Sequence, residues 1–72
     1  MATAVERFGS NVRKARLDRG WTQEDLSHAS GLAVVQVSRI ERGVREVRLT
    51  TLLRLLDALE VEPNTLLAVE DS

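Results

Sequence analysis

The sequence contains no cysteine, one histidine, one proline and two aromatic residues among its 72 positions. A chain without cysteine forms no disulfide and no thiolate metal site, and one histidine does not complete a zinc site by itself, so we expect no metal and no cofactor. No run of roughly 20 uncharged apolar residues is present, which argues against a membrane-spanning helix and a membrane partner. The first residues lack a basic segment followed by an apolar core, so the sequence predicts no secretory signal and a reducing, cytoplasmic location.

The composition that remains is typical of a small soluble globular protein. Hydrophobic residues make up 43% of the chain and charged residues 29%. This is too apolar for a disordered tail. The length is about half that of a typical domain, so we expect residues 1–72 to form a single domain.

The net charge of −1 at first argues against a polyanionic partner, but the charges are unevenly distributed. All ten basic residues and six acidic residues lie in residues 1–54, a net charge of +4. Residues 55–72 carry five acids and no base, a net charge of −5. Such asymmetry fits a protein with one surface for an anion and another that faces away, although ordinary solvated faces would give a similar pattern.

Apolar residues recur at spacings of three and four, which predicts an all-α fold. Phe8, Val12 and Ala15 share one face of a helix expected over residues 4–19 and closed by Gly20. Thr22 and Asp25 have the spacing of a capping box, which starts a short second helix.

The remaining helices are separated by glycine and proline. Gly31 supplies a sharp turn before a third helix over residues 33–42, which ends at Gly43. A loop over residues 44–48 leads to a fourth helix over residues 49–60. A short fifth helix starts at Pro63 and continues through Leu67, with Val69 as its furthest expected residue.

The third helix has two contrasting faces. At 100° per residue, Val37, Ile40 and Glu41 point towards the core. The opposite arc is polar and basic, and it consists of Val35, Gln36, Ser38, Arg39 and Arg42. A short helix, a glycine turn and a second helix with such an exposed face match the helix-turn-helix arrangement, whose second helix enters the DNA major groove.

The chain resembles the Cro/CI-type (XRE-like) helix-turn-helix family over nearly its whole length. The matching segments are Val12-Arg13 with Arg16, Trp21-Thr22-Gln23-Glu24-Asp25-Leu26, Gly31-Leu32, Val37-Ser38-Arg39-Ile40-Glu41-Arg42-Gly43, and the apolar stretch from Leu49 to Leu67. The resemblance implies a compact, lambda-repressor-like bundle of five helices. It also implies a homodimer that binds a palindromic operator in double-stranded DNA.

The resemblance further implies roles for individual residues. The positions that match base-contacting residues are Val34, Val35, Gln36 and Arg39. The positions expected to contact the DNA backbone are Thr22, Gln23, Ser38, Arg42, Arg45 and Arg48. Arg16 and Glu41 match a structural ion pair that ties the first helix to the third. The chain departs from the family at Ala33, where a capping Ser or Thr is usual, and at Arg48, where a proline is frequent.

The fourth helix carries an apolar arc of about 160°, wider than the roughly 100° that faces a single core. This excess predicts a two-fold dimer through the fourth and fifth helices, with Leu55, Leu66 and Leu67 as contacts. A broad but ordinary core is the alternative explanation.

Other marked residues have structural explanations. Phe8 and Trp21 are expected to pack in the core, because proteins that stack single-stranded nucleic acid on aromatic rings offer several. His28 has no partner at metal-ligand or catalytic spacing, so it is expected to be solvated and the protein is not expected to be an enzyme.

The sequence therefore favours a sequence-specific transcriptional regulator. We expect no effector domain and no small-molecule effector, because no segment follows the fifth helix. The compact format resembles restriction-modification controller proteins, small phage-type repressors and stand-alone antitoxins. The alternative function is a protein-interaction module, such as an antitoxin that grips a protein through its leucine-rich C-terminal helices. The arginines on and beyond the third helix favour DNA, because a protein-binding role would not require them.

Overall fold

The computed structural model describes residues 2–67, which form five helices and, within that range, no strand. The helices are α1 (Ala4–Asp18), α2 (Gln23–Ser30), α3 (Val34–Arg42), α4 (Leu49–Leu59) and α5 (Pro63–Leu67). The all-α prediction is confirmed, and the helices for which bounds were predicted lie within one or two residues of them. The expected extension to Val69 lies outside the described residues.

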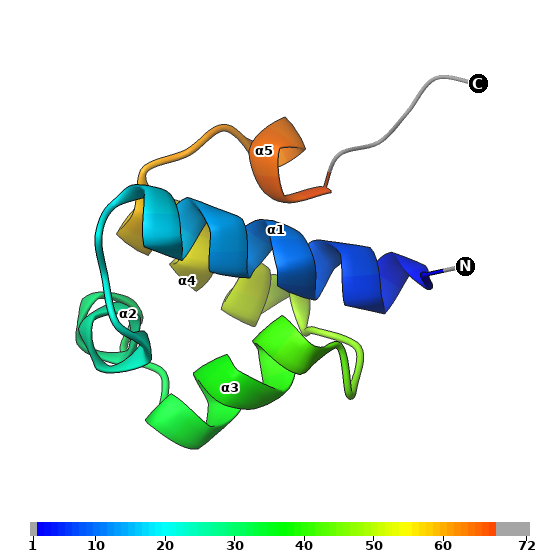
Figure 1. The fold of residues 1–72 in the computed structure, drawn as a ribbon, viewed down its shortest axis with the longest axis horizontal. Coiled ribbons are helices and arrows are strands. Elements are labelled where there is room, and N and C mark those ends of the chain that lie inside the picture. The colour runs from blue at the N-terminus through cyan, green and yellow to red at the C-terminus, as the bar shows by residue number, and fades with distance from the viewer. Residues whose placement is uncertain (1, 68–72) are drawn as a thin grey trace.

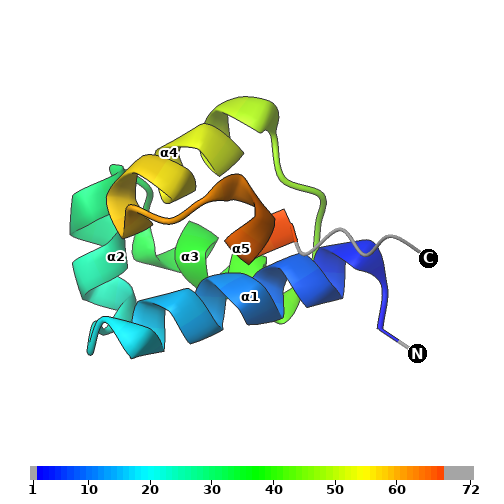
Figure 2. The same ribbon diagram turned by 90° about the horizontal axis from the view of Figure 1, so that it is seen from above.

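The helices pack around α1, which contacts both α3 and α5. Figure 1 shows these two helices on opposite sides of α1, with α4 behind it. Seen from above, α5 lies between α4 and α1 (Figure 2). The short α2 packs against α3 and α4 and completes the bundle. None of the helices in residues 2–67 is long and apolar enough to cross a membrane.

Every helix contributes to one apolar core. The fully buried side chains are Val12, Leu26, Val37, Leu55, Leu59 and Leu66. Phe8 and Trp21 are half-buried and pack against this cluster, as predicted. Arg19 also packs over Trp21, with its guanidinium carbon 4.4 Å from the ring centroid.

Two reciprocal capping boxes begin α1 and α2. The Thr22 hydroxyl accepts the Asp25 backbone N–H at 3.1 Å, and the Asp25 carboxylate accepts the Thr22 N–H at 2.8 Å, which confirms the predicted box. Thr3 and Glu6 form the same arrangement at the start of α1. The hydrogen bond from the Thr3 backbone, followed by that of its side chain, lowers the pKa of Glu6, because both favour the charged carboxylate.

Two glycines allow α1 and α3 to approach closely. A Cβ added to Gly9 would overlap the carbonyl oxygen of Ile40 and lie 2.8 Å from that of Glu41. A Cβ added to Gly43 would lie 2.6 Å from the Cα of Glu6. The backbone of α3 is therefore held directly against α1, and this contact fixes the position of the helix that presents the candidate site.

Candidate nucleic-acid interface

The turn between α2 and α3 is built by a glycine and two serines. Gly31 has φ 75°, a left-handed conformation that favours glycine, and its N–H donates to the Ser27 carbonyl at 3.0 Å. The Ser27 hydroxyl donates to the Leu32 carbonyl. The Ser30 hydroxyl donates to the Leu26 carbonyl at 2.6 Å and accepts the Leu32 N–H at 3.3 Å. These bonds satisfy the backbone groups of the turn and fix how α3 leaves α2.

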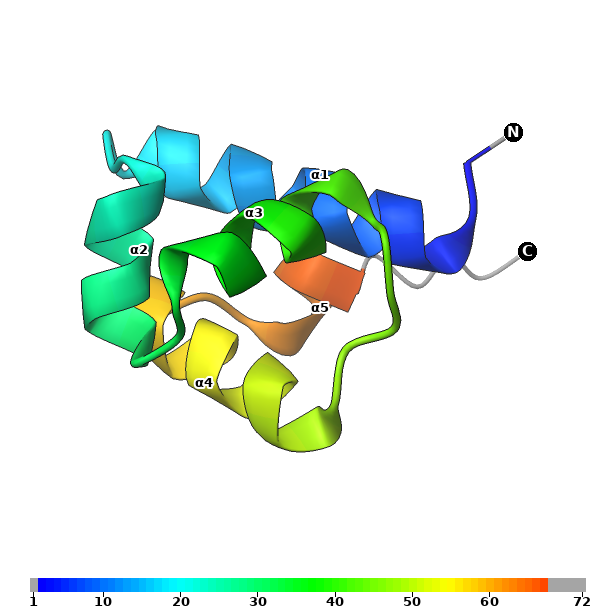
Figure 3. The same cartoon turned by 90° about the horizontal axis from the view of Figure 1, so that it is seen from below.

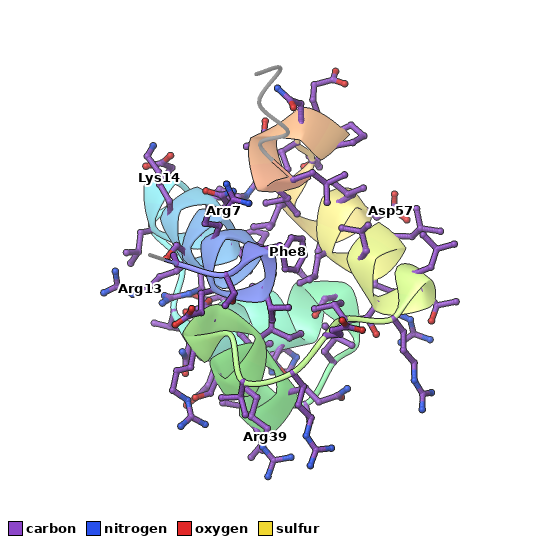
Figure 4. The ribbon with its side chains drawn as sticks, turned by 90° about the vertical axis from the view of Figure 1, so that its right-hand side faces the viewer. Arg7, Phe8, Arg13, Lys14, Arg39 and Asp57 are labelled. Carbon is purple, nitrogen blue, oxygen red and sulfur yellow. The ribbon has the colours of Figure 1, made fainter. Side chains whose placement is uncertain are left out.

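The third helix turns its apolar side inward and its polar side outward, as predicted. Val37 is fully buried, and Ile40 and Glu41 are each 9% exposed. The exposed residues of the outer side are Val34, Val35, Gln36, Arg39 and Arg42, and Ser38 is half-buried. Figure 3 shows α3 on the near face with no other helix across it. In Figure 4, Arg39 extends away from the body of the protein, so this face is available to a partner.

Arg16 and Glu41 form the predicted ion pair between α1 and α3. Arg16 Nε donates to Glu41 Oε2 at 2.7 Å and Nη2 donates to Oε1 at 3.0 Å, with the side chains 9% and 3% exposed. Arg16 Nη1 donates to the Trp21 carbonyl at 2.7 Å. The hydrogen bond to Glu41 raises the pKa of Arg16 above its ordinary value. The bidentate pair locks α3 against α1 from inside the protein.

Gln23, expected at the DNA backbone, also belongs to this network. Its Nε2 donates to Glu41 Oε1 at 3.2 Å, and the side chain is half-buried. The sequence did not indicate this contact, which ties the start of α2 to the same carboxylate. Thr22 is exposed at the start of α2, and its hydroxyl is occupied by the capping bond described above.

The start of α3 has an unusual cap. Ala33 at the N-cap position provides no side-chain acceptor. Instead the Gln36 side chain reaches back, and its Oε1 accepts the Ala33 N–H at 3.3 Å. The Gln36 amide nitrogen accordingly remains the group that this residue offers outward, which makes it a donor to any ligand in front of α3.

Three further arginines extend the basic surface beyond the outer face of α3. Arg42, Arg45 and Arg48 are exposed and form no ion pair within residues 2–67. Arg42 Nε donates weakly to the Ser38 carbonyl at 3.4 Å. In Figure 4, Asp57 lies on α4 at a different side of the molecule from Arg39. Four of the ten basic residues of the sequence, Arg39, Arg42, Arg45 and Arg48, lie on α3 or in the loop that follows it.

The expected dimer contacts are only partly accessible. Leu55 and Leu66 are fully buried in the core of one chain, so the prediction that they contact a partner is wrong. The wide apolar arc of α4 is present, but the core covers one edge of it and leaves Leu49 at 70% and Leu53 at 51% exposure. Leu67 is 44% exposed and stays a candidate contact.

Sequence reasoning missed the role of Gly9. The available signal was a glycine inside an otherwise regular amphipathic helix, because such a glycine lowers helix propensity and usually has a packing reason.

His28 is exposed, and no group of three His, Cys, Asp or Glu side chains in the described part of the chain is placed to hold a metal ion.

The turn, the anchored α3 and its basic outer face define a helix-turn-helix protein. The sequence profile of the helix-turn-helix family matches residues 12–66, and the chain belongs to this family. The Cro/CI-type resemblance seen in the sequence is thereby confirmed.

Individual relatives include controller proteins and longer regulators. Control protein C.BamHI of Bacillus amyloliquefaciens is 39% identical over 61 residues, covering 83% of this chain and 75% of that protein. The crystal structure of the restriction-modification controller protein C.AhdI from Aeromonas hydrophila matches with a TM-score of 0.82 and 40% identity, covering 86% of this chain and 94% of that one. The uncharacterized HTH-type transcriptional regulator Mb0023 of Mycobacterium bovis is 32% identical over 60 residues, and the chain spans 23% of its length.

Proposed function

We propose that this protein is a sequence-specific regulator that binds a palindromic operator in double-stranded DNA as a homodimer. The observation that carries the proposal is the outer face of α3, where exposed arginines project from a helix whose inner face is locked to α1 by the Arg16–Glu41 pair. A rigid helix with a basic, hydrogen-bonding face is suited to the DNA major groove.

The proposed base contacts come from the first two turns of α3. Arg39 reads guanine through O6 and N7, and Gln36 donates to a base or phosphate acceptor. Val34 and Val35, which are 39% and 58% exposed, pack on thymine methyl groups. The proposed contacts to the DNA backbone come from Thr22, Gln23, Ser38, Arg42, Arg45 and Arg48.

The proposed dimer uses the apolar surface that one chain leaves open. Leu49, Leu53 and Leu56 follow one line along α4 at helical spacing, and Leu52 beside them borders an apolar hollow that also includes Leu67. A small domain buries only about 60% of its unfolded surface, so a second copy on this face would add apolar burial. The two recognition helices would then lie ~34 Å apart, which corresponds to one turn of DNA.

The similarity to C.BamHI and C.AhdI supports a more specific role as a restriction-modification controller. Regulation in that case follows from the concentration of the protein and from dimerisation, without a small-molecule effector. The competing function is a protein-binding module that uses the exposed leucines of α4 for another protein.

Selection of bound sequences from random duplex DNA tests the proposed function directly. We expect one palindromic motif with half-sites about one turn apart. Arg39→Ala should relax the base preference at one position in each half-site, at a cost of about 1–3 kcal/mol. Arg45→Ala should weaken all sequences alike and reduce the salt slope by about 1 for each protomer. If neither variant changes DNA binding at two salt concentrations, the protein is not a regulator of this kind.

Sedimentation at micromolar concentration tests the dimer. Leu53→Asp places a charge on the proposed interface and should give a monomer, because a buried unpaired carboxylate is costly. Leu17→Asp is a matched control, since Leu17 is 47% exposed on α1, outside the proposed face. Unchanged dimer mass for Leu53→Asp would show that another surface joins the two copies, and a monomeric wild-type protein would favour the protein-binding module.

A further inference from the structure

A hollow of about 550 Å³ opens beside α3, between this helix, the loop over residues 44–48 and the first turns of α4. The charged residues that line it are one acid and four arginines, namely Glu46, Arg39, Arg45, Arg48 and Arg54. The hollow is continuous with the proposed base-reading face, because Gln36 and Arg39 belong to both. Its charge therefore attracts an anion at the edge of the surface that α3 presents.

Arg54 reaches this hollow from a helix that has no other proposed role in DNA binding. Its Nη1 lies 3.3 Å from the position that a Cβ on Gly31 would occupy, so the guanidinium stands beside the turn that starts α3. Within the described residues Arg54 forms no hydrogen bond and no ion pair. Arg19 differs from it, because Arg19 binds the Leu59 carbonyl at 3.0 Å and pairs with Glu60.

We propose that this hollow seats the sugar-phosphate backbone of the DNA strand that runs beside α3, and that Arg54 is a phosphate-binding residue. The inference rests on the proposed function and adds helix α4 to the DNA surface. A guanidinium that is exposed, free of internal partners and grouped with three others offers the planar pair of donors that a phosphate accepts. Glu46 is the one acid in the wall, so the walls keep a net charge of +3.

Continuity with α3 favours DNA over a small free anion. An extended polyanion that lies along α3 passes from Arg39 to Arg54 without leaving the basic surface. Each phosphate neutralised in this way releases counterions, so the contact has a measurable salt dependence.

The test compares Arg54→Ala with the wild-type full chain on its selected operator and on an unrelated duplex, at about 50 mM and about 200 mM salt. We expect binding to weaken roughly tenfold per protomer at the lower salt, equally on both duplexes. The salt slope should fall by about one per protomer, so the ratio of the variant and wild-type Kd should shrink about fourfold per protomer at the higher salt. Arg54→Lys should keep most of the slope, because it keeps the charge.

Arg7→Ala is the matched control for charge. Arg7 is exposed on α1 and lies well away from Arg39 in Figure 4, so this variant should bind as the wild type does. The inference is overturned if Arg54→Ala has wild-type affinity and slope, or if it lowers the melting temperature and leaves binding unchanged, which would show a structural role beside α2. A wild-type protein that binds no duplex overturns the proposed function as well, whereas an unchanged Arg54→Ala overturns this inference alone.

Discussion

Replacing Arg16 or Glu41 alone leaves one buried charge without its partner. The guanidinium has three hydrogen bonds in the structure, two to Glu41 and one to the Trp21 carbonyl. In Arg16→Met, the Glu41 carboxylate keeps only the amide of Gln23. In Glu41→Gln, the guanidinium keeps the Trp21 carbonyl and faces a neutral amide. We expect each single variant to lose about 3–5 kcal/mol of unfolding free energy.

This loss is large for a chain of this length. A stability of about 0.05–0.15 kcal/mol per residue gives roughly 4–11 kcal/mol in total, so either single variant loses a large part of it. The double variant Arg16→Met/Glu41→Gln removes both charges and leaves a neutral amide at position 41 beside the Gln23 amide, with the Trp21 carbonyl still to be satisfied. The two single costs should therefore exceed the double cost by about 3 kcal/mol or more.

Equilibrium urea unfolding at one fixed chain concentration measures this cycle. Costs that simply add would refute the reasoning.

Three further predictions concern the helix ends and the contact between α1 and α3. Gly9→Ala should destabilise the fold by about 1–3 kcal/mol or more through backbone overlap, despite its higher helix propensity, and the exposed Ser10→Ala should not. Thr3→Ala should cost about 1 kcal/mol near neutral pH and raise the pKa of Glu6 in an NMR titration. Because the folded pKa of Glu6 is lowered, the part of this deficit that comes from the Glu6 carboxylate should disappear as the pH falls through that pKa, whereas the part from the lost bond to the Glu6 backbone N–H should remain. Ala33→Ser should stabilise the fold by about 1 kcal/mol, because it supplies the missing cap, and should therefore raise the melting temperature. An unchanged melting temperature for Gly9→Ala or Ala33→Ser, or an unchanged Glu6 titration, would contradict the corresponding prediction.

The proposed DNA surface combines residues that a linear sequence separates. Arg39 belongs to α3, Arg45 and Arg48 to the following loop, and Arg54 to α4. The sequence indicated the first three, because they lie on or directly after the helix that the resemblance identified. Arg54 could be assigned only from the fold, since its position in the middle of α4 says nothing about the turn at Gly31.

The proposed dimer surface is a second feature that the sequence alone could not assign. A helical wheel gave the width of the apolar arc of α4 correctly, but it could not say which edge of the arc the other helices cover. The edge of the arc that contains Leu55 is buried in the core, and the edge that contains Leu53 is exposed. The choice depends on how α4 is rotated against the rest of the bundle, and that rotation is a property of the packed structure.

The sequence alone determined the helices, their caps and the inward and outward faces of α3, because these follow from spacing within a few neighbouring residues. The same local periodicity predicted that Glu41 points inward, and the family resemblance predicted Arg16 as its partner. The tertiary structure decided the close approach at Gly9, the network that includes Gln23, the hollow beside Arg54 and the leucines left exposed. Each of these depends on contacts between helices that are distant in the chain, and such contacts form only when the core packs.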